Sequence, residues 1–189
     1  DEKMKNVLIV SGHNDLNNSL ANTIILENLQ NSLPAAEFDF LDKLYPDYEF
    51  DVKKEQEKLV KADIIVLQFP IFWYSVPSLM KKWFEDIFIH GFSHGSTGKA
   101  LAGKTLIASF TTGSPAEAYK HGGMQNYTLD EFLPPLIQLA AISGMNWGGY
   151  VHTGGVSYAS RNNEAAQKEI KEKSFQHAQR LMEKLTALF

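Results

Sequence analysis

The chain has 189 residues, of which 44% are hydrophobic and 21% charged, and its formal net charge is −4 at neutral pH. These values favour a single globular domain spanning residues 1–189, and they argue against disorder and against the clustered Lys/Arg surface that binds duplex nucleic acid. The absence of cysteine excludes disulfides, thiol nucleophiles and Cys-ligated metal centres. With no signal-peptide pattern and no membrane-spanning apolar run, we expect a cytoplasmic protein.

Short apolar runs alternate with segments of helical periodicity, which is the pattern of repeated βα units. In chain order the expected strands are residues 5–10, 36–41, 63–69, 104–110 and 147–152. The expected helices are residues 19–30, 51–61, 76–88, 128–142 and 164–188. Ser75 is the expected N-cap of the third helix, and Pro134-Pro135 should kink or delay the fourth.

The second expected strand differs from the others. Residues 37–40 alternate polar and apolar, whereas strands one, three and four are nearly continuous apolar runs, as expected of parallel strands covered on both faces. We therefore place the second strand at an edge. The prediction is an α/β fold with a doubly wound, five-stranded parallel sheet of flavodoxin-like order 2-1-3-4-5 in three αβα layers.

A polar loop follows the first strand. Residues 11–22 are small and hydrogen-bonding, and they lead into a helix N-terminus. Free backbone N–H groups, the helix dipole and hydroxyl or imidazole donors can together hold a phosphate without a lysine. An ordinary capped connection between a strand and a helix explains the same residues equally well.

An aromatic loop follows the third strand. Pro70 and Pro77 stiffen the chain on either side of three consecutive aromatic residues. Trp73 and Tyr74 lie beyond the strand, where burial against protein alone would leave their polar atoms seeking partners. Such a loop at the carboxyl end of a parallel strand suits a flat aromatic ligand.

Two further segments contain residues that occur at ligand or metal sites. Thr111-Thr112-Gly113-Ser114 follows the fourth strand and should reach the same sheet edge, although such a tetrapeptide alone is more often a turn. His90 and His94 are four residues apart, but Gly91 disfavours a helix there and no acidic third ligand follows. We therefore expect no metal site, and we interpret residues 90–103 as a surface loop open to a site or a partner.

Taken together, these motifs resemble the NAD(P)H:quinone oxidoreductase family of flavodoxin-like flavoproteins, from about residue 4 to residue 155. The resemblance rests on His13 with residues 19–22, on residues 62–66, 68–77 and 82–84, and on Thr111-Thr112-Gly113. Residues 44–47, 90–92 and 144–147 are most similar to the ancillary quinone reductases of glutathione-regulated potassium efflux systems.

The resemblance implies a bound flavin, and FMN is favoured over FAD because a short chain leaves little room for an adenosine-binding extension. It implies that the phosphate is held by His13, Ser19, Leu20, Ala21 and Asn22. It implies that the flavin ring lies against Pro70, Ile71, Phe72, Trp73 and Tyr74, with the remaining ring contacts from Thr111, Thr112, Gly113 and Ser114. It further implies a homodimer in which NAD(P)H and a quinone, or a similar aromatic acceptor, share one pocket near the subunit boundary.

Two residues depart from the family pattern. Ser114 stands where a second glycine is usual, and Gln125 stands where longer relatives carry a histidine that stabilises reduced flavin. Tyr119 is retained, and His121 follows two residues later. Tyr119 and His121 are therefore the catalytic candidates.

We accordingly predict a flavin-dependent NAD(P)H:quinone oxidoreductase that transfers two electrons by a ping-pong sequence. One alternative is a flavodoxin-type carrier of single electrons, although the charge of −4 is mild for that class. The other is a regulatory ancillary subunit that binds a membrane potassium-efflux protein, which would place the chain peripherally at the inner membrane face.

Overall fold

The computed structural model describes residues 4–157 and 162–189. Five parallel strands form one sheet: β1 (Val7–Ser11), β2 (Glu37–Phe40), β3 (Ile64–Pro70), β4 (Thr105–Thr111) and β5 (Asn146–Thr153). The strand order is β2-β1-β3-β4-β5, so the predicted order and the predicted edge position of β2 are both confirmed.

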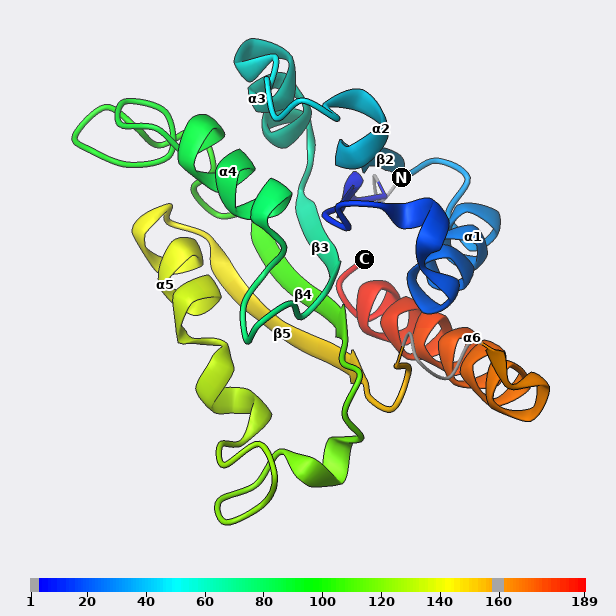
Figure 1. Cartoon of the computed structure of the whole chain (residues 1–189). Coiled ribbons are helices and arrows are strands. Elements are labelled where there is room, and N and C mark those ends of the chain that lie inside the picture. Colours follow the sequence, from blue (N-terminus) through cyan, green and yellow to red (C-terminus); the bar gives the residue numbers. More distant parts are fainter. Residues whose placement is uncertain (1–3, 158–161) are drawn as a thin grey trace.

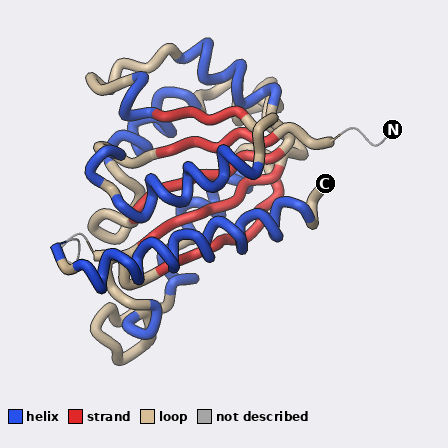
Figure 2. Tube along the Cα trace, turned by 90° about the vertical axis from the view of Figure 1, so that its right-hand side faces the viewer, coloured by secondary structure: helices blue, strands red, loops and turns tan. Residues whose placement is uncertain are grey.

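Helices cover both faces of this sheet (Figure 1). Helices α1 (Leu20–Ser32) and α6 (Glu164–Thr186) pack on one face and lie in front of the strands in Figure 2. Helices α2 (Leu41–Leu44), α3 (Val52–Lys61), α4 (Ser78–Ile87) and α5 (Pro134–Ile142) pack on the other. Short 3₁₀ helices, among them η1 (Leu16–Asn18), η2 (Ala116–Ala118) and η3 (Leu129–Phe132), lie in the loops. The predicted three-layer αβα arrangement is confirmed.

The alternation of side chains along β1 divides the core into two halves. Val7 and Ile9 pack with α1 and α6, whereas Leu8 and Val10 pack with the helices of the other face. Both β1 and β3 are buried along their whole length, which explains their continuous apolar sequences. Within the described residues, no helix combines the length and apolarity needed to cross a bilayer.

Two helix starts differ from simple expectation. Ser75 does not cap α4, because its backbone closes a turn with Phe72 and Pro77 occupies the N-cap position without a side-chain bond. The predicted interruption by Pro134-Pro135 is confirmed: η3 ends at Phe132 and α5 begins at Pro134. Proline suits a first helical turn because the backbone N–H groups there have no intrahelical acceptor.

Candidate functional site

A cavity of about 570 Å³ opens at the carboxyl edge of β1, β3 and β4. This volume is within the range of roughly 300–1,000 Å³ common for small-molecule sites. Three loops predicted from the sequence meet there. From the predicted set, the lining includes His13, Ser19, Leu20, Ala21, Asn22, Pro70, Ile71, Phe72, Thr111, Thr112 and Gly113.

The N-terminus of α1 forms one wall of the cavity. Ser19 is the N-cap, and its hydroxyl oxygen accepts a hydrogen bond from the backbone N–H of Asn22 at 3.1 Å. The N–H groups of Leu20 and Ala21 lie in the first turn, where a helix supplies no acceptor for them. Together with the positive end of the helix dipole, they make this wall suited to an anion.

His13 stands beside the same wall with a defined tautomer. The backbone N–H of Asp15 donates to its Nδ1 at 2.8 Å, so the proton of the neutral ring is on Nε2. Burial lowers the pKa of His13 below its usual value and outweighs the opposing charges of Asp42 and Asp15. The Phe72 ring meets the imidazole edge-on with centroids 5.4 Å apart. His13 is therefore a neutral N–H donor at the cavity.

The loop after β4 forms the facing wall. Thr112 donates its hydroxyl proton to the carbonyl of Ser114 at 2.8 Å, which fixes the start of the turn. Gly113 does not have a left-handed φ, and a Cβ built there would meet nothing closer than 3.8 Å, from Ser157. The packing of the chain does not require a glycine at this position, so the space beside Gly113 remains open for a ligand.

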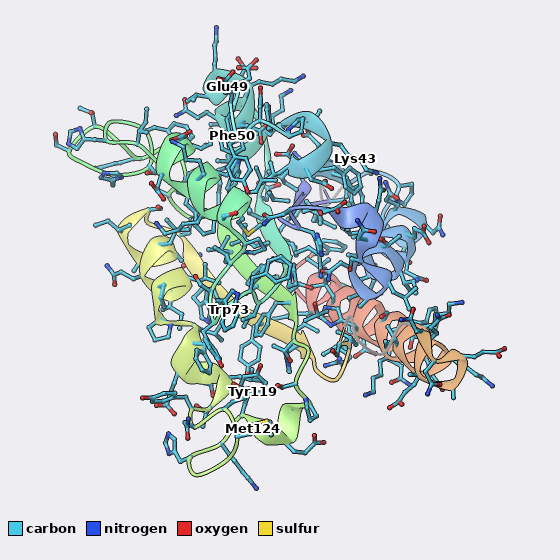
Figure 3. All side chains as sticks on the ribbon, viewed as in Figure 1. Lys43, Glu49, Phe50, Trp73, Tyr119 and Met124 are labelled. Carbon is cyan, nitrogen blue, oxygen red and sulfur yellow. The ribbon has the colours of Figure 1, made fainter. Side chains whose placement is uncertain are left out.

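The aromatic loop is a tight turn closed by two hydrogen bonds between the backbones of Phe72 and Ser75, at 3.0 and 3.2 Å. The turn places Trp73 at φ 47° and Tyr74 at φ 68°. Such left-handed positions cost a bulky residue about 1–3 kcal/mol each and often occur at functional sites. Trp73 is 91% exposed, and neither residue lines the cavity. The strained turn therefore presents an indole beside the cavity, on the loop labelled in Figure 3.

The remaining predicted residues lie on the segment after β4, where Figure 3 labels Tyr119 and Met124. None of Ser114, Tyr119 and His121 lines the cavity. The Tyr119 ring meets His152 edge-on with centroids 6.1 Å apart. His121 is exposed and its Nε2 is hydrogen-bonded to the Glu131 carboxylate. Ser114 thus belongs to the loop after β4 without lining the cavity, whereas Tyr119 and His121 lie further along the chain.

The two departures from the family pattern are in contact. The side-chain amide of Gln125 donates to the hydroxyl of Ser114 at 2.7 Å. The backbone N–H of Gln125 donates to the carbonyl of Ala118 at 3.1 Å. Gln125 therefore anchors the end of the loop that begins at Thr111, and Ser114 supplies the acceptor that a glycine would lack.

A second, more apolar cavity of about 350 Å³ lies between the aromatic loop, α4 and α5. Ile71 lines both cavities, so the two adjoin. The Tyr74 ring, which also lines the second cavity, stacks on Phe132 with centroids 5.7 Å apart. This space is suited to an apolar or aromatic group next to the first cavity.

Some lining residues were not predicted. Asn14, Asp15 and Asn18 belong to the polar loop after β1, so the sequence located their segment without singling them out. Val156, Ser157 and Ile170 follow β5 or lie on α6, where the sequence carries no ligand-binding motif. Within the described residues, no group of three His, Asp or Glu side chains is placed to hold a metal ion.

Comparisons with known proteins cover most of the chain and its fold. A family model described as Flavodoxin-like fold matches residues 5–178. General stress protein 14 of Bacillus subtilis is 38% identical over 82% of this chain and 87% of its own length. The glutathione-regulated potassium-efflux system ancillary protein KefG of an Enterobacter species is 37% identical over 75% of this chain and 76% of its own length.

Two solved structures extend the comparison. General stress protein 14 of Treponema denticola, solved in complex with FMN, is 25% identical with a TM-score of 0.83, over 98% of this chain and 99% of that chain. A protein of P. pentosaceus described as an NADPH-quinone reductase is 26% identical with a TM-score of 0.74, over 93% of this chain and 98% of that chain.

Proposed function

The chain belongs to the family of flavodoxin-like fold, and we propose that it is an FMN-dependent NAD(P)H:quinone oxidoreductase. The observation that carries this proposal is the cavity itself, which joins an anion-binding helix N-terminus to an apolar and aromatic wall. The FMN complex of one relative and the quinone-reductase description of another support it.

The residues present fit the phosphate of FMN. The hydroxyl of Ser19, the backbone N–H groups of Leu20 and Ala21, and the Nε2–H of His13 form a set of neutral donors around one wall. Neutral donors at a helix N-terminus bind a phosphate without the desolvation cost of a buried lysine. Asn22 completes the wall and orients Ser19 through its backbone N–H.

The residues present also fit a flat ring. Pro70, Ile71 and Phe72 supply an apolar surface. In the loop after β4 the backbone N–H groups of Gly113 and Ser114 can support negative charge on the ring, whereas that of Thr112 is bonded to the carbonyl of Thr153. Bound there, the flavin would supply hydride acceptance from NAD(P)H and two-electron delivery to a quinone. The chain's part is to orient the ring and exclude water from one side of it.

Nicotinamide and quinone would take turns at the open side, next to the second cavity. We assign Trp73 and Tyr74 to this side because the turn that holds them projects both beyond the wall. Tyr119 is our first catalytic candidate, since it packs edge-on to Phe132, as Tyr127 does, in the aromatic group that includes Tyr74. His121 is the second candidate, with Glu131 as its partner.

A homodimer belongs to the same proposal. Large apolar side chains are exposed around this side, including Trp73, Met124, Tyr127 and Ile142. Exposed apolar patches of this kind mark protein interfaces more often than free surface. A second copy covering them would close the nicotinamide and quinone pocket.

The proposal is tested on the purified chain. We expect it to bind FMN, identified by its absorption spectrum and by chromatography of the released flavin, and to reduce menadione with NADH or NADPH. Initial rates at several concentrations of both substrates should give parallel double-reciprocal lines. Protein that takes up no FMN at high concentration would refute the cofactor assignment, and intersecting lines would refute the shared pocket.

A partner role in potassium efflux is a second candidate, favoured by the 37% identity to KefG. In that role the chain would be cytoplasmic and would meet the inner membrane face only through a transporter. Residues 90–103 are the surface loop that we assign to this contact. Co-purification with a potassium-efflux protein, lost when exposed residues of this loop are changed, would support the role.

A flavodoxin-type electron carrier would use the same cofactor. It would need a protein partner to be reduced, whereas the proposed enzyme accepts hydride directly from NAD(P)H. Bleaching of the FMN absorbance by NAD(P)H in a solution of this protein alone would exclude the carrier role.

A further inference from the structure

A continuous chain of hydrogen-bonded side chains runs from α6 to the floor of the first cavity. Its members in order are Arg180, Thr153, His177, Ser109, Gln68, Asn22 and Thr111. The successive distances are 2.8, 2.8, 2.7, 2.5, 3.0 and 3.0 Å. Arg180 is exposed, whereas each of the other six side chains is at most 6% exposed.

The direction of the hydrogen bonds follows from counting protons in the middle of the chain. Ser109 donates its one proton to Gln68, so it must accept from the Nε2–H of His177. His177 is neutral, because burial lowers its pKa to about 3. Its Nδ1 therefore carries no proton and accepts from the Thr153 hydroxyl. Thr153 in turn accepts from Arg180, whose guanidinium has donors only.

The same direction continues to the cavity. The amide N–H of Gln68 donates to the carbonyl oxygen of Asn22, and the amide N–H of Asn22 donates to the hydroxyl oxygen of Thr111. Asn22 and Thr111 both line the cavity. In the described part of the chain, no acceptor takes the hydroxyl proton of Thr111. The chain therefore ends in a donor whose proton is available to a ligand.

The uncharged members of this chain could also form the same hydrogen bonds in the opposite direction, with each donor and acceptor exchanged. Gln68 and Asn22 would exchange their amide oxygen and nitrogen, and His177 would move its proton to Nδ1. Thr111 would then donate to Asn22 and would have no proton left for a ligand. Arg180 disfavours this reversal, because Thr153 would receive two donors and its own buried proton would have no acceptor.

We propose that Arg180 and His177 are positioning residues of the FMN site, which fix the direction of this chain so that Thr111 stays a hydrogen-bond donor into the cavity. The inference rests on the proposed function for the identity of the ligand. Arg180 does not line the cavity. It also donates two hydrogen bonds to the carbonyl of His152 at 3.1 Å, so the tautomer of His177 and the double variant with Thr111 are what isolate its effect through the chain. The alternative is that the chain only provides hydrogen-bond partners for buried polar groups, and that the direction of its hydrogen bonds has no effect on FMN binding.

The first measurement needs no cofactor. Nitrogen-15 NMR of the His177 imidazole in the FMN-free protein at neutral pH should show the Nε2–H tautomer. Arg180→Met should let the Nδ1–H tautomer appear, whereas Arg180→Lys, which is also a donor only, should restore Nε2–H. Lys184→Met is the matched control, because Lys184 is a cation one turn further along α6 and outside the chain. A predominant Nδ1–H tautomer in the unaltered protein, or no change in R180M, overturns the inference.

The second measurement links the chain to the ligand. Fluorescence titration with FMN should show that R180M and Thr111→Val each weaken binding by roughly three- to tenfold, the worth of one hydrogen bond. The double variant should bind within about twofold of T111V alone, because both changes remove the same donor. Additive losses overturn the inference, and R180K and K184M should bind as the unaltered protein does.

The two proposals fail in different ways. An unaltered protein that binds no FMN refutes the proposed function, and this inference falls with it. Normal FMN binding in both the unaltered protein and R180M refutes only the role of the chain.

Discussion

The two faces of the sheet carry buried polar groups of opposite character. On the face of α1 and α6 lies the neutral chain that runs from Thr153 to Thr111. On the other face Lys58 bridges Asp39, at 2.9 Å, and Glu55, at 2.8 Å. We call the group formed by Asp39, Glu55, Lys58, Tyr45 and Trp83 the charged cluster. The neutral chain reaches the cavity, whereas no residue of the charged cluster lines it.

The difference lies in how each group is compensated. In the neutral chain uncharged groups bond to one another, so burial requires no counter-ion. The charged cluster holds two acids and one cation, and one oxygen of Asp39 has no partner among the described residues. Burial, followed by the neighbouring Glu55, raises the pKa of Asp39 to about 8. The neutral chain can therefore orient a ligand at any ordinary pH, whereas the charged cluster anchors β2 to α3 and α4 at a pH-dependent strength.

The largest effect is expected from Glu55→Ala. Glu55 is fully buried and accepts hydrogen bonds from Tyr45, Trp83 and Lys58 at 2.9, 3.0 and 2.8 Å. Its removal leaves the buried Tyr45 and Trp83 donors without an acceptor and takes from Lys58 one of its two carboxylates, so the free energy of unfolding should fall by about 3–5 kcal/mol. Urea unfolding measures this loss.

Ser109→Ala is the comparison variant on the other face. It breaks the neutral chain in the middle and should cost about 1–3 kcal/mol, because only uncharged groups lose partners. The FMN affinity of folded E55A should stay normal, since the charged cluster does not touch the cavity. A cost of E55A below that of S109A would show that the charged cluster is no anchor.

The next effect is a stability maximum at about pH 6.5, set by Asp39 on the alkaline side and by His152 and His177 on the acidic side. The folded pKa of Asp39 is raised from 3.8 to about 8, so the folded state holds the extra proton and stability is lost as pH rises through that range. Burial lowers the folded pKa of His152 to about 4 and that of His177 to about 3, so the unfolded state takes up their protons below 6.5 and stability is lost as pH falls.

Above pH 6.5 the loss should be about 1.4 kcal/mol per pH unit for the one proton of Asp39. Asp39→Asn should abolish this alkaline loss and should steepen the acidic side, because Asp39 opposes the two histidines between about pH 4 and pH 6.5. Burial alone would raise the pKa of Glu55, but the neighbouring Asp39 and Lys58 outweigh it and lower the pKa, so Glu55 contributes only below about 4.5. Urea unfolding from pH 5 to 8.5 measures both sides, and an alkaline loss that persists in D39N would contradict the assignment.

The cavity was more predictable from the sequence than either buried group. Its walls come from short segments, and each segment has a local sequence pattern that can be recognised. These patterns are Ser19 before a helix, Pro70 and Pro77 around the aromatic residues, and Gly113 after a strand. Parallel strands bring their carboxyl ends to one edge, so a correct strand order was enough to gather these segments. The exposure of Trp73 was not predictable, because it depends on a left-handed turn that no glycine marks.

The buried polar groups were not predicted from the sequence because their hydrogen-bond partners are distant along the chain. Glu55 lies in a helix rich in Lys and Glu that looks solvent-exposed, and its contacts to Tyr45 and Trp83 depend on tertiary packing. His177 carried a usable signal, since it continues the inward stripe of Ile170 and Leu181 on α6. A polar residue on an apolar stripe indicates burial, but the pattern does not predict which residue is its hydrogen-bond partner.

Removal of a helix N-cap should have a smaller effect on stability, and it can show whether the cavity wall binds FMN. Ser19 and Asp51 are N-caps whose side chains accept from the backbone N–H three residues on, at 3.1 Å in each case. Ser19→Ala and Asp51→Ala should each lower the free energy of unfolding by about 1 kcal/mol. Only S19A should also weaken FMN binding in a fluorescence titration, because only Ser19 lines the cavity. Equal FMN affinities of the two variants would refute the assignment of Ser19 to the phosphate site.

The smallest effect on stability is expected at the exposed pair of His121 and Glu131. The His121 side chain is 71% exposed, and solvent screens ion pairs of this kind, so His121→Gln should change the free energy of unfolding by less than about 1 kcal/mol. FMN affinity should also stay constant, because His121 does not line the cavity. A catalytic role would therefore appear only as a lower kcat for menadione in steady-state assays. Unchanged kcat in H121Q, together with a reduced kcat in Tyr119→Phe, would assign the catalytic role to Tyr119 alone, whose ring is partly buried against His152 and Phe132.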